Sequence, residues 1–101
     1  MGEVLRTDEQ ELAAVRNFFD GDRLVTIPAR RSRRVLVLRY LAEQFRPGQR
    51  YPERDVNWIL GRHHRDFALL RRLLVDEELL QRDRDGGSYW RAGSIPGVEW
   101  P

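Results

Sequence analysis

Glycine and proline divide this chain into short segments, and this division restricts the available folds more than any other feature of the sequence. Breaks stand at Gly21, Pro28, Pro47-Gly48, Gly61 and Gly86-Gly87. None of the stretches between them is a run of about 20 apolar residues, as a membrane-spanning helix requires. With 101 residues, the chain is long enough for one modest core and too short for two. We therefore expect a single domain of short helices and strands.

The first segments predict a helix followed by an extended stretch. Residues 7–10, Thr-Asp-Glu-Gln, form a capping box, and apolar residues then recur at helical spacing. We expect a helix over residues 8–20 that ends at Gly21. Residues 23–27 contain β-branched side chains and stop at Pro28, which is typical of an edge strand.

Three further helices are expected in the middle of the chain. The second covers residues 31–45, with an apolar face that includes Val35, Leu38 and Phe45. After a turn at residues 46–50 and a short segment at Tyr51, a third helix begins with Pro52 and runs to Gly61. A fourth covers residues 66–79, and its apolar side chains lie on one face.

The end of the chain predicts a β-hairpin. Residues 80–82 and 89–91 are strand-like and flank an Asp-Gly-Gly turn. Two short helices joined by a glycine-bearing turn and followed by a hairpin are typical of a winged helix-turn-helix. We predict an α+β, mostly helical domain of this type over residues 23–91, with an N-terminal helical extension at 1–22 and an extended or disordered tail at 92–101.

Charge is distributed unevenly along the chain. All 18 basic residues are arginine, which favours planar, bidentate contacts to phosphate and guanine, although a GC-rich genome also replaces lysine with arginine. Residues 1–22 hold two arginines and six acids, a net charge of −4; residues 23–46 hold seven arginines and one acid, or +6; residues 47–101 hold nine of each. The middle of the chain is thus expected to meet an anionic partner.

The fourth predicted helix would present arginines opposite its apolar face. At 100° per residue, Arg65, Ala68, Arg72 and Asp76 share the outer side, and Arg71 lies at the border. Arginine pairs with guanine, and the small Ala68 permits close approach to a thymine methyl. A solvated face with an Arg72–Asp76 pair explains the same pattern. Arg71 also has a structural interpretation, in which it bridges to acidic residues at position 53, 66 or 76.

Two other groups of arginines are candidates for phosphate contacts. Arg82 and Arg84 lie in the predicted hairpin, where wing residues of such domains reach the nucleic-acid backbone. A basic run stands at the start of the second helix, where the helix dipole disfavours cations and an anion would compensate. A merely solvated cluster is the alternative for this run, which comprises Arg30, Arg31, Arg33 and Arg34.

Nothing in the sequence predicts an enzyme, a metal site or a cofactor. His63 and His64 are adjacent in a turn and diverge, and His64 with Asp66 is better explained as the cap of the fourth helix. There is no cysteine, and neither a phosphate-binding glycine loop nor a nucleophile with its base. The first residues lack the pattern of a secretory signal, so we expect a cytoplasmic protein.

One set of residues, spread over most of positions 18–91, forms a dense pattern: Gly21, Arg23-Leu24, Ile27-Pro28, the basic run through Arg34, Leu38, Phe45, Tyr51, Glu53, Val56-Asn57, His64, Asp66, Leu70-Arg71-Arg72, Val75-Asp76, Arg82 and Tyr89-Trp90. In these residues the sequence resembles a bacterial family of unknown function, DUF2087. The resemblance implies a fold related to winged-helix transcription regulators. Arg30 and Arg33 stand where the family has lysines. Arg65 stands where the family tends to have an acid, which favours Arg71 and Arg72 as the arginine pair shared within the family.

Together these features predict a transcriptional regulator that binds double-stranded DNA. The alternative is a protein-interaction module whose basic face docks an acidic partner without contacting nucleic acid. A homodimer is also expected, because Phe18, Phe19 and Trp100 are apolar groups near the termini that a small monomer would leave exposed.

Overall fold

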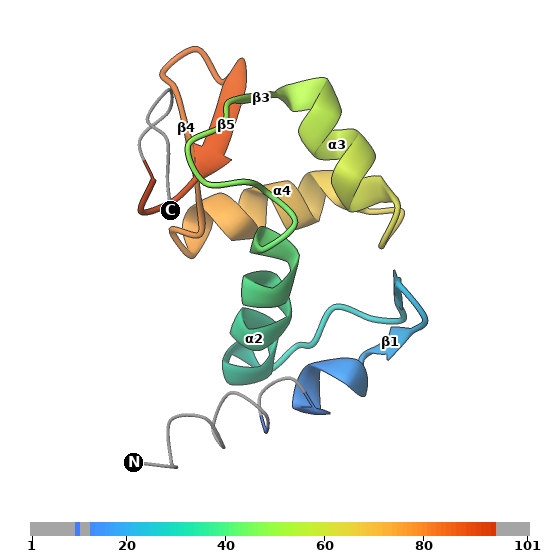
Figure 1. Cartoon of the computed structure of the whole chain (residues 1–101). Helices are drawn as coiled ribbons and strands as arrows, with labels where there is room; N and C mark the ends of the chain where they lie inside the picture. Colours follow the sequence, from blue (N-terminus) through green and yellow to red (C-terminus); the bar gives the residue numbers. More distant parts are fainter. Residues whose placement is uncertain (1–9, 11–12, 95–101) are drawn as a thin grey trace.

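The structure is a computed structural model, and it describes residue 10 and residues 13–94 as an α+β domain. Three helices and five short strands follow a helical turn at residues 13–16. Figure 1 shows α4 running across the middle, with α2 on one side of it and the strands β3, β4 and β5 on the other. In chain order the elements are β1 (Phe19–Asp20), β2 (Arg23–Leu24), α2 (Arg31–Ala42), β3 (Tyr51–Pro52), α3 (Glu53–Gly61), α4 (Phe67–Asp76), β4 (Leu80–Arg82) and β5 (Ser88–Arg91).

One core lies between the three helices and the sheet. It is built from the apolar faces predicted by helical spacing, and its largest fully buried side chains include Phe45 and Tyr89. Each helix contributes residues that repeat at three- and four-residue intervals, so one side of every helix is buried and the other faces solvent. The buried helical residues are Val37, Leu38, Leu41 and Ala42 of α2, Val56 and Leu60 of α3, and Leu70 and Leu74 of α4.

The larger sheet has the order β3-β5-β4, and both strand pairs are antiparallel. Tyr89 occupies the centre, paired with Tyr51 on one side and Arg82 on the other. The predicted hairpin is therefore present, and the short segment at Tyr51 joins it as a third strand. Tyr51 is buried, packs edge-on against Phe45 and accepts a hydrogen bond at its hydroxyl from the backbone N–H of Arg46.

The expectation for the N-terminal segment is wrong beyond residue 16. Helical backbone ends at Arg16 instead of residue 20, and Phe19-Asp20 forms a strand that pairs with Arg23-Leu24. Gly21 has φ +64° and turns this hairpin instead of ending a helix. The predicted capping box at residues 7–10 lies outside the described residues apart from position 10.

Contacts with a distant turn explain why a hairpin replaces the end of that helix. The Leu24 N–H donates to the carbonyl of His63 at 2.7 Å, and the ring Nδ1 of His63 donates to the carbonyl of Asp22 at 2.6 Å. Arg23 reaches two carbonyls of the same turn, those of Gly61 and Arg62. Leu24 is buried in the core, so tertiary contacts override the local helical pattern.

The three middle helices are confirmed, with ends that differ from those expected. α2 stops at Ala42 instead of residue 45, although Phe45 is still fully buried. Pro52 precedes α3 as its N-cap and belongs to β3. α4 ends at Asp76 instead of residue 79, because Glu78 adopts a left-handed conformation (φ 59°) that stops the helix and directs the chain into β4.

Two further expectations concern exposed apolar residues and membranes. Phe18 and Phe19 are half-buried against the core, and Phe19 meets the rings of Tyr40 and His63, so they are less exposed than expected; the homodimer inferred from them stays a prediction. Trp100 lies outside the described residues. No helix in the described part of the chain has the length and apolar character needed to cross a bilayer.

Candidate nucleic-acid interface

Two hydrogen bonds define the start of α4. The Asp66 carboxylate accepts from the backbone N–H of Leu69 at 3.2 Å, which is the geometry of an N-cap. The N–H of Asp66 itself donates to Nδ1 of His64 at 2.9 Å. The prediction that His64 and Asp66 cap this helix is confirmed. These contacts fix where the exposed face of α4 begins.

The outer face of α4 carries the predicted polar side chains. Ala68, Arg72 and Asp76 of α4 are exposed. Arg65 is exposed as well, but it precedes the N-cap Asp66 and lies outside the helix, so the expectation that it shares this helical face is wrong. Arg72 and Asp76 form an i,i+4 ion pair at 3.8 Å, with 80% and 60% of the side chains exposed. Such an exposed pair contributes about 0.3–0.5 kcal/mol, so it opposes an incoming anion only weakly. For the residues of α4 itself, the predicted exposure and the local ion pair are confirmed.

Arg71 lies at the edge of the buried face and is held by α3. Its guanidinium donates to Asn57 Oδ1 and lies 3.8 Å from a carboxylate oxygen of Glu53, and only 21% of its side chain is exposed. The same Glu53 oxygen accepts from the Tyr89 hydroxyl at 2.9 Å. The pKa of Tyr89 is raised above its ordinary value of 10.0, mainly because the hydroxyl is buried and also because it lies against the Glu53 carboxylate. The hydroxyl therefore remains a donor at neutral pH.

This arrangement assigns Arg71 a structural role. Its network joins α3, α4 and β5 directly beneath the exposed face of α4. Of the bridges considered from the sequence, the one to Glu53 is present.

Asp83 shapes the turn of the β4–β5 hairpin. One carboxylate oxygen accepts from the N–H groups of Gly87 and Ser88, and the other accepts from the Ser88 hydroxyl at 2.8 Å. These hydrogen bonds, that from the hydroxyl above all, hold the pKa of Asp83 below its ordinary value of 3.8 against an opposing effect of burial. Arg84 lies in the same turn and is exposed.

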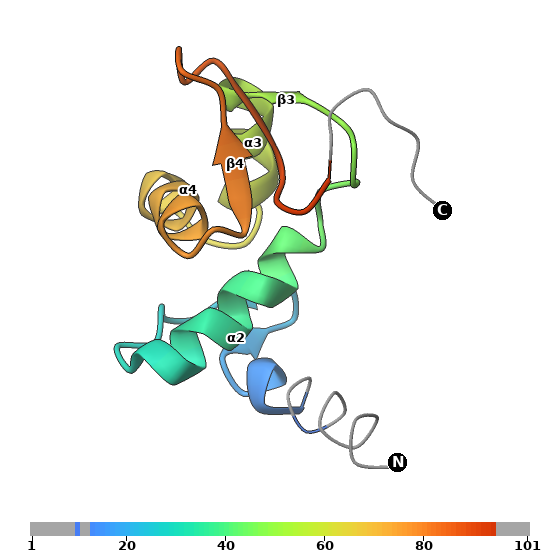
Figure 2. The same cartoon turned by 90° about the vertical axis from the view of Figure 1, so that its left-hand side faces the viewer.

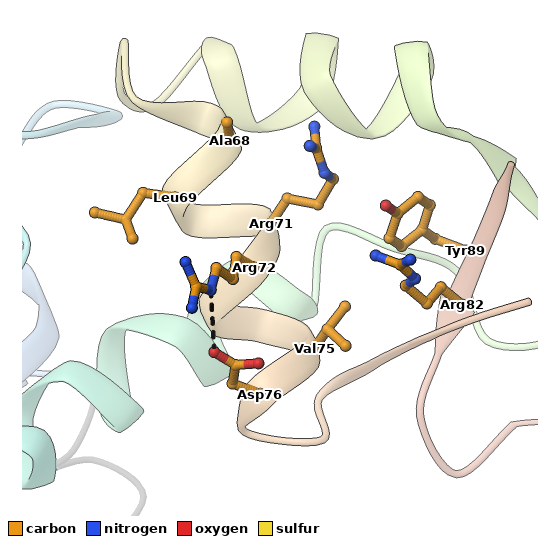
Figure 3. A pocket seen from close by; sticks show the side chains of 8 residues that line it. All are labelled: Ala68, Leu69, Arg71, Arg72, Val75, Asp76, Arg82 and Tyr89. Atoms are coloured by element: carbon orange, nitrogen blue, oxygen red, sulfur yellow. Dashed lines mark ion pairs between the residues drawn. The ribbon is translucent and has the colours of Figure 1, made fainter. Parts of the chain in front are cut away.

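A groove of about 590 Å³ separates the outer face of α4 from the hairpin. Figure 3 shows Arg72 and Arg82 projecting from α4 and β4, with the Tyr89 ring at the sheet side of the groove. In Figure 2, α4 is seen nearly end-on, with β4 beside it. The groove is lined by Ala68, Leu69, Arg71, Arg72, Val75, Asp76, Arg82 and Tyr89.

The structure divides the basic run at the start of α2. Arg31 forms a bidentate pair with Glu77, with distances of 3.1 and 2.8 Å. Arg34 donates to the carbonyls of Pro28 and Ala29, and its buried Nε has no partner. Arg30 and Arg33 are exposed, and neither side chain forms an ion pair or hydrogen bond with another described residue. Arg31 and Arg34 are thus committed to the fold, and Arg30 and Arg33 remain the candidates for phosphate.

Two features of this surface were not found by the sequence reasoning. Arg50 lies 5.0 Å from the centroid of the Trp90 ring and donates to the Ser88 hydroxyl, so it braces the hairpin. Trp58 of α3 is 67% exposed. The i,i+4 spacing of Trp58 with Arg54 and Arg62, opposite Val56 and Leu60, was the signal for the second of these.

Metal binding has no support from the described residues, among which no group of three or more His, Asp or Glu side chains is placed to hold an ion. His63 is instead buried against the N-terminal hairpin, and His64 takes part in the cap of α4.

Comparison with known proteins gives one assignment. A profile of the family described as "Uncharacterized protein conserved in bacteria (DUF2087)" matches residues 23–91. The chain belongs to the DUF2087 family. No curated protein and no solved structure matches the chain. The DUF2087 match covers the elements that build the groove, from β2 to β5, and thereby confirms the resemblance carried by the sequence.

Proposed function

We propose that this DUF2087 protein is a DNA-binding transcription regulator of the winged-helix type. The order of its elements supports this proposal: α2, β3, α3, α4 and then the β4–β5 hairpin, with β3 added beside β5. In a domain of that type the second helix of the α3–α4 pair enters the major groove, and the hairpin reaches the flanking backbone. In this chain α4 would be the recognition helix and the β4–β5 hairpin the wing.

The observation that carries the proposal is the continuity of one basic surface across α4 and the hairpin. The groove between them is lined by arginines from both elements, and the exposed Arg65 and Arg84 lie just before α4 and just after β4 in the chain. A helix of 10 residues with one face fully committed to the core presents its other face as a rigid unit. Such a surface matches the combination of base edges and phosphates in duplex DNA.

The contacts divide the arginines by role. Arg72, exposed on α4, and Arg65, exposed in the turn that precedes α4, would contact bases or phosphates, and the small Ala68 would allow close approach. Arg82 and Arg84 would contact the backbone beside the wing. Arg71 would act as a positioning residue, because it is engaged with Asn57 and Glu53.

The start of α2 would extend this surface. The Arg31–Glu77 pair links the first turn of α2 to the C-cap of α4, which brings Arg30 and Arg33 to the far end of the recognition helix. Their exposure and lack of partners among the described residues suit contacts to phosphate.

Fluorescence anisotropy of a labelled duplex of random sequence, measured across a salt series, tests the proposal. The logarithm of the affinity should fall linearly with the logarithm of salt concentration. Arg84→Ala should make that slope shallower by about 1, as expected for the loss of one phosphate contact. Arg72→Ala should also weaken binding.

Arg16→Ala is the matched control, because it removes the same charge from an exposed position in the N-terminal helical turn. Its slope should equal that of the unaltered protein. Equal slopes for Arg84→Ala and Arg16→Ala would place the phosphate contacts elsewhere. Absence of binding by folded protein at low salt would reject DNA binding and favour the alternative, an acidic protein partner for the basic face.

A further inference from the structure

The outer face of α3 carries the most exposed large apolar side chain in the described residues. Trp58 is 67% exposed, and it lies on the side of α3 opposite the buried Val56 and Leu60. Phe67, at the first turn of α4, is 36% exposed and lies against Gly61, where an added Cβ would be 3.5 Å from its ring. Two aromatic rings therefore border one surface at the junction of α3 and α4.

Arginines flank these rings. The guanidinium carbon of Arg62 lies 5.3 Å from the centroid of the Trp58 ring, a cation–π geometry that holds the indole in place. Arg54, one turn earlier on α3, has a side chain that is 89% exposed and only a loose pair with Asp55 at 3.9 Å. The result is a shallow, open groove of about 470 Å³, lined by Arg54, Asn57, Trp58, Gly61, Arg62 and Phe67.

We propose that this groove, the Trp58 groove, binds an acidic protein segment that inserts an apolar side chain between Trp58 and Phe67. Tryptophan and arginine are the residue types that most often dominate binding energy at protein interfaces. The rings supply apolar contact area, and Arg54 and Arg62 supply charges on either side for carboxylates. This site is distinct from the proposed DNA interface, because none of its lining residues borders the groove between α4 and the hairpin, and Phe67 is its one contribution from α4.

Charge and apolar contact favour an acidic protein segment over a second copy of the chain and over duplex DNA as the ligand of this groove. A second copy related by a two-fold axis would bring Arg54 and Arg62 against the same cations of its partner, which disfavours self-association through this groove. The backbone of duplex DNA would satisfy the arginines but offers no apolar group to cover Trp58 and Phe67. A segment with carboxylates around an apolar anchor satisfies both parts of the groove.

The probe is a labelled synthetic peptide of 16 residues, a length of about four helical turns. It is amphipathic and rich in glutamate, and its leucine and phenylalanine anchors lie one helical turn apart. Anisotropy should show saturable binding to the full chain. Trp58→Ala should weaken it at least about ten-fold, the loss expected for a central interface residue. Arg62→Gln should weaken it less. Val25→Ala, which alters another exposed apolar residue on a different element, should leave it unchanged.

Two control peptides separate the contributions, one with lysine in place of every glutamate and one with serine in place of both anchors. Neither should bind. The proposal is overturned if the acidic peptide does not bind, if Trp58→Ala binds it normally, or if a control peptide binds equally well. It is also overturned if duplex DNA displaces the peptide and Trp58→Ala loses DNA affinity, because the groove would then belong to the nucleic-acid interface.

Discussion

Arginine residues of the same charge serve different purposes in this chain. Arg71, with 21% of its side chain exposed, is engaged by Asn57 and Glu53 of α3, whereas Arg72 pairs only within α4 and is 80% exposed. A guanidinium that satisfies buried polar groups contributes to folding, and an exposed one contributes little. Arg71 and Arg72, adjacent in sequence, therefore have separable effects on stability and on binding.

Arg71→Ala should lower the free energy of unfolding by about 1–3 kcal/mol, because it removes a charged hydrogen bond to Asn57 and leaves Glu53 without its cation. Arg72→Ala should change it by less than about 0.5 kcal/mol, as is usual for exposed positions. Urea denaturation followed by circular dichroism measures both. Equal losses in the two variants would contradict the structural role of Arg71.

Asp83 should make the β4–β5 hairpin sensitive to acid. Its pKa is lowered in the folded state by hydrogen bonds from Ser88, Gly87 and Gly86. A carboxyl with a lowered pKa stabilises the fold above the ordinary pKa of 3.8, and that contribution is lost as the pH falls through the lowered value. Below pH 4 the amide signals of Gly87 and Ser88 should therefore move together with the Asp83 carboxyl in an NMR titration.

Asp83→Asn provides the control for this titration, because the amide cannot titrate. Its Gly87 and Ser88 signals should show no inflection below pH 4. An Asp83 inflection at or above 3.8 in the unaltered protein would contradict the hydrogen-bonded turn described above.

At the level of elements, the β4–β5 hairpin depends on one tight turn. Gly86 has φ +71°, and an added Cβ would lie 3.2 Å from the Arg82 guanidinium. At the adjacent Gly87, an added Cβ would meet nothing within 4 Å, and the φ angle is not positive. The position of Arg82 beside the groove is therefore tied to the absence of a side chain at residue 86.

Gly86→Ala should destabilise the domain by about 1–2 kcal/mol, the cost of a left-handed conformation for a residue with a Cβ. Gly87→Ala should be neutral or slightly stabilising, since alanine reduces the freedom of the unfolded chain. Thermal unfolding of the pair of variants tests this difference. A loss of stability in Gly87→Ala as large as that in Gly86→Ala would show that the hairpin does not adopt the turn described here.

The elements that sequence analysis predicted are those specified locally. α2, α3, α4 and the β4–β5 hairpin follow from apolar spacing, glycine and proline breaks and the cap at Asp66, all read within about 15 residues. The β1–β2 hairpin was missed because it depends on His63, which is far away in the sequence. The candidate site divides in the same way. Periodicity placed Ala68 and Arg72 on the exposed face of α4. The partners of Arg31 and Arg71 come from other segments and were not specified locally.

At the scale of the whole molecule, two surfaces of different chemistry lie on one small domain. The groove between α4 and the hairpin is basic and suits phosphates and base edges, and the Trp58 groove on α3 combines aromatic rings with arginines. The Arg71 network lies between α3 and α4 and fixes the two helices relative to each other. The two proposals therefore assign DNA to one surface and a protein partner to the other.

The most direct test of the central proposal is a map of backbone amide shifts on adding duplex DNA to the full chain labelled with ¹⁵N. We predict that the largest changes fall on residues 65–76 of the α4 region and 82–88 of the hairpin, together with the start of α2, and that the Trp58 indole signal does not move. Changes confined to other elements, or none at low salt, would contradict the assignment of α4 and the hairpin as a DNA-binding surface.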